Sequence, residues 1–268
     1  MQPPRNCNPT PFAYHALVEV TIDALTNLGT GLGRVDGWVV MVPFALPGER
    51  VRARIFRNHA NYSEGDLIEV LRPSADRVEP RCTLFGECGG CQYQHLSYPA
   101  QLQWQRRHVA EVLERIGGIT VEVLPPIGSP RPYHYRSKLT PHFPKPRKPK
   151  TTDDPGRESS LPVGFLRVGR RQSVIDVPSC PIATEAINEA LPAARNAVRE
   201  RALEAASRKK PRGGTLLLRH SREGVTTDSN EVVSEAIGER VFQFRAGDFF
   251  QNNPFILPLL VDYVISEA

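Results

Sequence analysis

The sequence contains no long apolar run. None of its stretches approaches the roughly 18 consecutive apolar residues that a membrane-spanning helix needs. The first residues, MQPPRNCNPTPF, hold prolines and polar side chains where a secretory signal peptide has an apolar core. We therefore expect a cytoplasmic protein with no membrane partner.

Cysteine is scarce, with five in 268 residues, and no Ser/His/Asp arrangement or pair of catalytic carboxylates stands out. Thiols stay reduced in the cytoplasm, so clustered cysteines there indicate metal binding more than disulfides. The 40% hydrophobic and 24% charged content is ordinary for a globular protein.

Positive charge is in modest excess, at +5, which weakly favours a polyanionic partner. It gathers in two runs: Lys145, Arg147, Lys148 and Lys150, and then Arg208, Lys209, Lys210 and Arg212. Taken alone, each run is equally well read as a solvated loop.

Residues 17–73 have the pattern of a small β-barrel. Apolar residues alternate in LVEVTI and in RVRARIF, which is typical of half-buried strands. Glycine-rich turns separate the segments, and the spacing predicts a five-stranded barrel of the oligonucleotide-binding kind. The GTGLG run is not a dinucleotide fingerprint, because no βαβ unit surrounds it.

Four cysteines have a spacing that predicts one inorganic centre: Cys82, Cys88, Cys91 and Cys180. Gly89 and Gly90 remove side-chain bulk between two of them, where backbone N–H groups approach sulfur. An iron–sulfur cluster is favoured over zinc because the second short-spaced cysteine pair of most zinc sites is missing. Zinc and unliganded thiols remain the alternatives.

The rest of the chain alternates helices with short strands. A helix is predicted over 98–116, with Ser97 before it and Gly117 after it. Residues 119–246 read as mainly β, interrupted by a helix over 184–206. The fold class predicted is therefore mainly β with helices, that is, α+β.

Several motifs now occur in a recognisable order: CxxxxxCxxCxYQH, ERIGG, YRSK, a later CP, and FFQNNP. Together they resemble the RNA (uracil-5-)-methyltransferases, which make 5-methyluridine in ribosomal or transfer RNA. The cysteine pattern is most similar to the 23S ribosomal RNA branch, which carries a [4Fe-4S] cluster.

The resemblance implies a TRAM RNA-binding barrel and a cluster held by the four cysteines. It also implies that Gln251, in the FFQNN stretch, contacts S-adenosyl-L-methionine; a capping or loop amide would be the plain reading of that residue. The partner implied is RNA, ribosomal more than transfer RNA, and we expect a monomer.

The domains expected are a disordered tail (1–13), the TRAM barrel (14–74), a central cluster domain (75–246), and the start of a methyltransferase domain (247–268). The predicted helix near 97–117 would pack on the catalytic domain. The family continues into a Rossmann-like methyltransferase domain with a nucleophilic cysteine, and the sequence stops before these motifs. We therefore predict that this domain is absent and that the isolated chain is inactive.

Four residues are the predicted RNA contacts: Arg136, Lys138, Tyr135 and Arg34. Cations pair with phosphates, and a tyrosine ring can stack on a base. Residues alternating on a half-exposed strand would give the same pattern as the YHYRSKL stretch.

Two other functions fit part of the pattern. One is a stand-alone TRAM RNA-binding module with a structural metal site. The other is a radical enzyme that modifies transfer RNA, which is disfavoured because those enzymes use a C-x3-C-x2-C motif and carry TRAM at the opposite end.

The cluster prediction is tested by anaerobic purification followed by metal analysis and absorbance spectroscopy. We expect about four irons per chain with broad visible absorbance. One zinc per colourless chain would replace the cluster by a zinc site.

Overall fold

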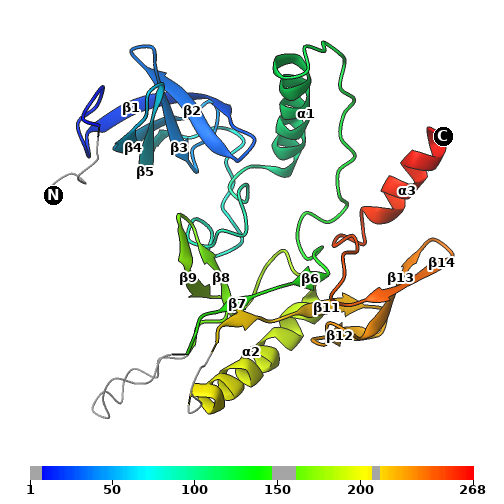
Figure 1. The fold of residues 1–268 in the computed structure, drawn as a ribbon. Helices are drawn as coiled ribbons and strands as arrows, with labels where there is room; N and C mark the ends of the chain where they lie inside the picture. The colour runs from blue at the N-terminus through cyan, green and yellow to red at the C-terminus, as the bar shows by residue number, and fades with distance from the viewer. Residues whose placement is uncertain (1–7, 147–160, 207–211) are drawn as a thin grey trace, which may run out of the picture. The chain divides into compact units, whose positions relative to one another are not determined.

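The structure is a computed structural model that describes residues 8–146, 161–206 and 212–268. The chain divides into two compact units, Met1–Arg81 with Cys91–Pro126 and Cys82–Gly90 with Ile127–Ala268 (Figure 1). No helix within the described ranges is long and apolar enough to cross a membrane.

The first unit contains a closed five-stranded barrel in the order β1-β2-β3-β5-β4. Its strands are β1 (Leu17–Leu25), β2 (Thr30–Val35), β3 (Trp38–Pro43), β4 (Arg50–Asn58) and β5 (Tyr62–Arg72). Alternate residues point inward, because side chains along a strand alternate between its two faces. The barrel core consists of Val20, Ile22, Val40, Val42, Ala45, Val51, Ala53 and Ile55. The predicted five-stranded barrel is confirmed.

The glycine run of β2 lies where backbones approach most closely. A Cβ on Gly33 would stand 2.0 Å from the carbonyl oxygen of Thr21, and one on Gly31 would stand 2.6 Å from that of Ala45. Both distances are far shorter than any real contact, so a side chain at either position would force the backbones apart. The run therefore serves barrel packing, in agreement with its rejection as a dinucleotide fingerprint.

A buried carboxylate fixes the chain that leaves the barrel. Glu49 is fully buried and accepts hydrogen bonds from the backbone N–H of Leu46 (2.8 Å), that of Ser74 (3.2 Å), and the guanidinium of Arg77 (2.8 Å). Arg77 also donates to the carbonyl oxygen of Phe44 at 2.8 Å. Burial alone would raise the pKa of Glu49, but these hydrogen bonds outweigh it and the pKa is lowered.

Helix α1 (Tyr98–Arg115) belongs to the same unit as the barrel. Its first turns are anchored there: Ala100 shares a small hydrophobic cluster with Leu25, Leu46 and Leu96, and Trp104 packs against it. Farther along the helix, the apolar side chains of Val109 and Val112 are each 49% accessible.

The second unit is built from short strands in three sheets, ordered β10-β7-β8-β9, β12-β11-β6 and β13-β14. The strands are β6 (Lys138–Leu139), β7 (His142–Phe143), β8 (Gly164–Arg167), β9 (Arg170–Asp176), β10 (Gly214–Thr215), β11 (Leu218–Ser221), β12 (Gly224–Thr226), β13 (Val232–Ile237) and β14 (Arg240–Arg245). Two helices complete the unit, α2 (Glu185–Ala206) and α3 (Leu257–Ser266).

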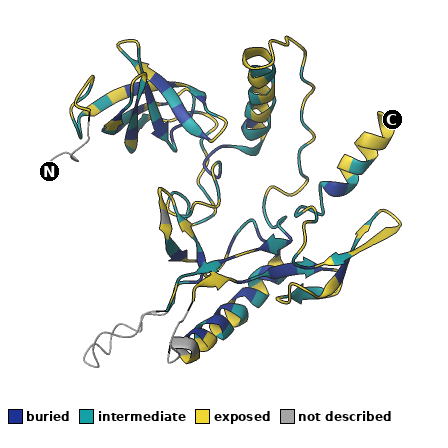
Figure 2. Cartoon of the chain, viewed as in Figure 1, coloured by how far each residue is buried: buried dark blue, intermediate teal, exposed yellow. Residues whose placement is uncertain are grey.

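Helix α2 packs one face onto the core of the second unit, as the sequence predicted (Figure 2). Ile187, Leu191 and Val198 are buried there, because residues three or four apart share a helix face. An ion pair adds to the packing: the carboxylate of Asp176 in β9 accepts from Arg195 and Arg199 of α2.

Replacing Glu49 by alanine should lower the free energy of unfolding by roughly 3 kcal/mol, because a largely buried arginine loses its partner. Since the folded pKa lies below the carboxyl's usual 4.5, this contribution is present above that value and is lost as the pH falls through the lowered pKa. Chemical denaturation at a series of pH values measures both effects.

The matched control is Glu69→Ala, which removes an exposed carboxylate that pairs with Arg52 on the barrel surface. An exposed pair contributes less than about 1 kcal/mol. Equal losses in the two variants would contradict a special role for Glu49.

Candidate RNA-binding and cofactor-binding site

A buried arginine organises the end of the second unit. Arg219, in β11, is 1% exposed and pairs in register with Lys138 of β6. Its guanidinium donates to the carbonyl oxygens of Ala246 (3.3 Å) and Asp248 (3.0 Å) and to the side-chain oxygen of Asn252 (3.2 Å). One side chain thus holds both ends of the 246–252 segment.

Lys138 holds the same segment. Its ammonium donates to the carbonyl oxygens of Gly247 (2.6 Å) and Asp248 (3.0 Å). Burial lowers the pKa of Lys138, and the nearby charge of Arg219 lowers it further, while Asp248 opposes both. The cation predicted to contact RNA therefore already binds backbone oxygens of its own chain.

The two asparagines of the FFQNN stretch are occupied as well. The carbonyl oxygen of Asn252 accepts from the backbone N–H of Ser137 at 2.8 Å. The side-chain oxygen of Asn253 accepts from the N–H groups of Phe255 (3.1 Å) and Ile256 (3.3 Å), which caps the turn leading into α3. The capping amide of this stretch is thus Asn253.

Gln251 differs from its neighbours. Its side chain is exposed, and it takes part in none of the hydrogen bonds found among the described residues. Phe250 beside it stacks on Phe244 of β14, with ring centroids 4.2 Å apart and planes 2° apart. Gln251 therefore presents a free amide on an anchored backbone, which is what a ligand-binding residue requires.

The other predicted RNA contacts lie on two different units. Arg136 is half-buried, and its Nε donates to the carbonyl oxygen of Lys138 at 3.1 Å. Tyr135, next to it, is half-buried too. Arg34 is exposed on β2, in register with Thr21 of β1. Tyr135 and Arg136 directly precede Ser137, whose N–H donates to the carbonyl oxygen of Asn252, whereas Arg34 belongs to the barrel.

The outer face of the barrel pairs its charges internally. Arg50 contacts Glu19 (2.6 Å), Arg52 contacts Glu69 (2.5 Å), and Arg54 contacts Asp66 (2.9 Å) across β1, β4 and β5. Residues 14–74 as a whole carry six arginines and no lysine against seven carboxylates. The excess positive charge of the protein therefore lies outside the barrel.

The cysteine loop is docked onto the β8–β9 turn of the second unit. The N–H of Gly89 donates to the carbonyl oxygen of Leu166 (2.9 Å), and Glu87 pairs with Arg167 (2.7 Å). A Cβ on Gly89 would stand 3.0 Å from that same carbonyl oxygen. This close approach accounts for a glycine here without any metal.

Of the four predicted ligands, Cys180 is buried and Cys82, Cys88 and Cys91 are half-buried. Cys180 is part of the hydrophobic core of the second unit, and Cys88 packs against that core. Among the described residues, no three His, Cys, Asp or Glu side chains gather so as to hold a metal ion. The four-cysteine cluster stays a prediction from spacing.

Comparison with known proteins defines the class of the first unit. Residues 16–68 match the family model of the TRAM domain. Residues 16–68 therefore form a TRAM domain, as the resemblance implied.

The similarity extends well beyond that domain. A tRNA (uracil(54)-C(5))-methyltransferase of Schizosaccharomyces pombe is 39% identical over 267 residues, which cover 95% of this chain and 48% of the relative. An uncharacterised RNA methyltransferase of Halalkalibacterium halodurans is 37% identical over 234 residues, covering 86% of this chain and 48% of the relative. The chain is thus homologous to RNA methyltransferases and spans about half the length of these relatives.

A solved structure shares the fold. The tRNA (uracil-54, C5)-methyltransferase of Pyrococcus abyssi, in complex with S-adenosyl-L-homocysteine, aligns with a TM-score of 0.60 at 21% identity. The alignment covers 92% of this chain and 64% of that chain.

These alignments correct one prediction. The expectation that the Rossmann-like methyltransferase domain is absent, and that the chain lacks the catalytic machinery, is wrong. Similarity to methyltransferases runs along 95% of the chain in sequence and 92% in structure. The expectation relied on the point where the sequence stops, and that point carries no information about the protein's domains.

Sequence reasoning missed Arg219. A signal existed, since a single arginine follows the apolar run TLLL and would be expected to need buried partners. Its partners, however, lie 27 to 33 residues later in the chain, and no local pattern connects them.

Replacing Arg219 by alanine should release the 246–252 segment and lower the free energy of unfolding by about 2 kcal/mol, because the carbonyl oxygens of Ala246 and Asp248 and the side-chain oxygen of Asn252 lose their donor. Hydrogen exchange should accelerate at the backbone amides of this segment. The control is Arg222→Ala, an exposed arginine just beyond the same strand. Similar exchange in both variants would contradict the anchoring role.

Proposed function

We propose that the protein is an RNA (uracil-5-)-methyltransferase, which transfers the methyl group of S-adenosyl-L-methionine to carbon 5 of a uridine in RNA. Support comes from the homology along nearly the whole chain to RNA methyltransferases, one of which is named for uracil-54. A stand-alone TRAM module does not account for similarity that extends far beyond residues 16–68.

Gln251 is the residue that we propose for cofactor binding. The observation that carries this role is its free amide on a backbone held by Arg219 and Lys138. Neighbouring side chains are already occupied, since Asn253 caps the turn before α3 and Phe250 stacks on Phe244. When bound, S-adenosyl-L-methionine supplies the methyl group, and the amide can donate to it or accept from it.

The RNA substrate that we propose is transfer RNA. The relative from S. pombe and the structural neighbour from P. abyssi are both named as tRNA methyltransferases acting at uracil-54. The expectation of ribosomal RNA came only from the resemblance of the cysteine pattern to the ribosomal branch of the family. A methylation assay on tRNA and ribosomal RNA transcripts separates the two.

For RNA contact we propose Arg34 on the barrel and Tyr135 with Arg136 in the second unit. Arg34 is exposed and stands outside the paired charges of the barrel's outer face. Lys138 is proposed to act through the 246–252 segment, because its ammonium already donates to two carbonyl oxygens there. The four-cysteine cluster stays a separate proposal, tested by metal analysis as described above.

Replacing Gln251 by alanine should weaken S-adenosyl-L-methionine binding about tenfold, which corresponds to the loss of one to two hydrogen bonds. Isothermal titration calorimetry measures the affinity, and mass spectrometry of digested RNA measures 5-methyluridine. Thermal stability should not change, because this side chain is exposed and makes no hydrogen bond within the described residues.

The control is Gln243→Ala, which removes an exposed glutamine from β14. Unchanged cofactor affinity in Gln251→Ala would refute the role of this residue. Absence of 5-methyluridine in all RNAs treated with the unmodified protein would refute the proposed function itself.

A further inference from the structure

The pairing of β7 with β10 brings together two segments that are far apart in the sequence. The strands run antiparallel, with Phe143 opposite Gly214 and His142 opposite Thr215. Close contact continues past the strand ends, because a Cβ on Gly213 would stand 3.0 Å from the backbone nitrogen of Lys145. Residues 144–145, which follow β7, therefore lie beside Gly213, which precedes β10.

This pairing explains the placement of the two basic runs. One run begins at Lys145, just after β7, and the other ends at Arg212, just before β10. Lys145 and Arg212 therefore lie at the same end of the four-stranded sheet. Of the two runs, Lys145 and Arg212 are the described members, and both are exposed at this end of the sheet.

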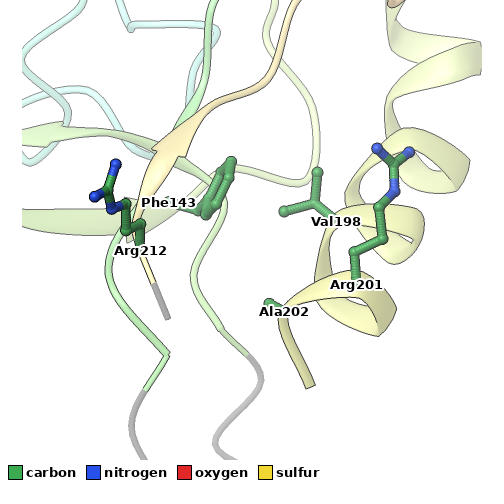
Figure 3. Close-up of a pocket in the computed structure, with 5 residues that line it drawn as sticks. All are labelled: Phe143, Val198, Arg201, Ala202 and Arg212. Atoms are coloured by element: carbon green, nitrogen blue, oxygen red, sulfur yellow. The ribbon is translucent and has the colours of Figure 1, made fainter. Parts of the chain in front are cut away.

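A hollow lies beside this end of the sheet (Figure 3). Phe143 from β7 and Val198 and Ala202 from α2 form its apolar lining, and Arg201 and Arg212 line it from opposite sides. Its volume is about 150 Å³, well below the roughly 300–1,000 Å³ of sites that enclose a whole cofactor. The space suits one planar group held between an aromatic ring and cations.

The aromatic ring is fixed in position. A Cβ on Gly214 would stand 2.7 Å from the Cζ atom of Phe143, so the ring lies directly against the backbone of β10. Arg201 and Arg212 are both exposed, and neither forms an ion pair among the described residues. The cations therefore remain available to an anionic ligand, unlike the arginines on the outer face of the barrel.

We propose that this end of the sheet is a second RNA-binding surface, in which Lys145, Arg201 and Arg212 contact phosphates and the Phe143 ring stacks on one base. It rests on the proposed RNA substrate and adds a contact that neither the TRAM barrel nor the Gln251 segment supplies. Cations tracking the backbone beside an aromatic ring form a general pattern of single-stranded RNA binding.

The first test measures RNA affinity of the full protein at a series of salt concentrations. The double variant Arg201→Gln with Arg212→Gln should bind transfer RNA roughly tenfold more weakly at physiological salt. Each lost phosphate contact reduces the slope of log K against log salt by about 0.7–0.9, so the slope should fall by about 1.5. The control, Arg115→Gln with Arg170→Gln, makes the same charge change at two other exposed arginines.

The second test separates stacking from charge. Phe143→Leu keeps an apolar side chain but removes the ring, and it should weaken binding at least about fivefold. Phe143→Tyr keeps the ring and should bind as the unmodified protein does. Circular dichroism and thermal denaturation check that each variant folds. If Phe143→Leu does not fold, the double arginine variant by itself tests the proposal.

The outcomes distinguish the two proposals. If the unmodified protein binds and methylates RNA while the arginine variant matches its control, this second surface is ruled out and the proposed function stands. A folded Phe143→Leu variant with unchanged affinity rules it out equally. If the unmodified protein binds no RNA, both proposals are overturned.

Discussion

The end of the second unit depends on the burial of one guanidinium. Arg219 is 1% exposed and donates to groups at both ends of the 246–252 segment. A buried cation is costly unless its N–H groups are satisfied, and here the carbonyl oxygens of a loop satisfy them. The loop and the cation therefore require each other: without the loop the charge would be unpaired, and without the charge the loop carbonyls would lose their donors. The fixed backbone that results is what allows Gln251 to be both exposed and well placed.

Much of the fold could be predicted from local patterns. Alternation in segments such as LVEVTI gave the barrel, and helical spacing gave the buried face of α2 at Ile187, Leu191 and Val198. Such predictions succeed because strand and helix periods are local properties of the chain. The Glu49–Arg77 contact could not be found in this way, since 28 residues separate the partners and only the folded barrel brings them together. The pairing of β7 with β10 is a longer-range case of the same limit.

The candidate site was predicted less completely, and the reasons differ between residues. Gln251 was singled out by resemblance, and its free amide could be recognised only after Asn253 was seen to cap the next turn. Lys138 was chosen as a cation that could pair with RNA phosphates, yet its ammonium binds carbonyl oxygens 109 and 110 residues away in sequence. The cysteines show another limit of sequence patterns: their spacing indicates which thiols could bind one metal centre, but it does not show that they do. The wrong prediction that the methyltransferase domain is absent had a different cause: it treated the end of a sequence as a property of the protein.

The paired charges on the barrel's outer face have a consequence for selectivity. Arg50, Arg52 and Arg54 already face carboxylates on adjacent strands. A phosphate that approaches these arginines must displace a carboxylate of the same protein. Non-specific binding of polyanions to this face is therefore weak. Only an RNA whose phosphates have the same spacing as these arginines could replace several carboxylates at once. The barrel would then select RNA by its geometry, and attraction over longer distances would come from exposed cations outside the barrel, such as Arg201 and Arg212.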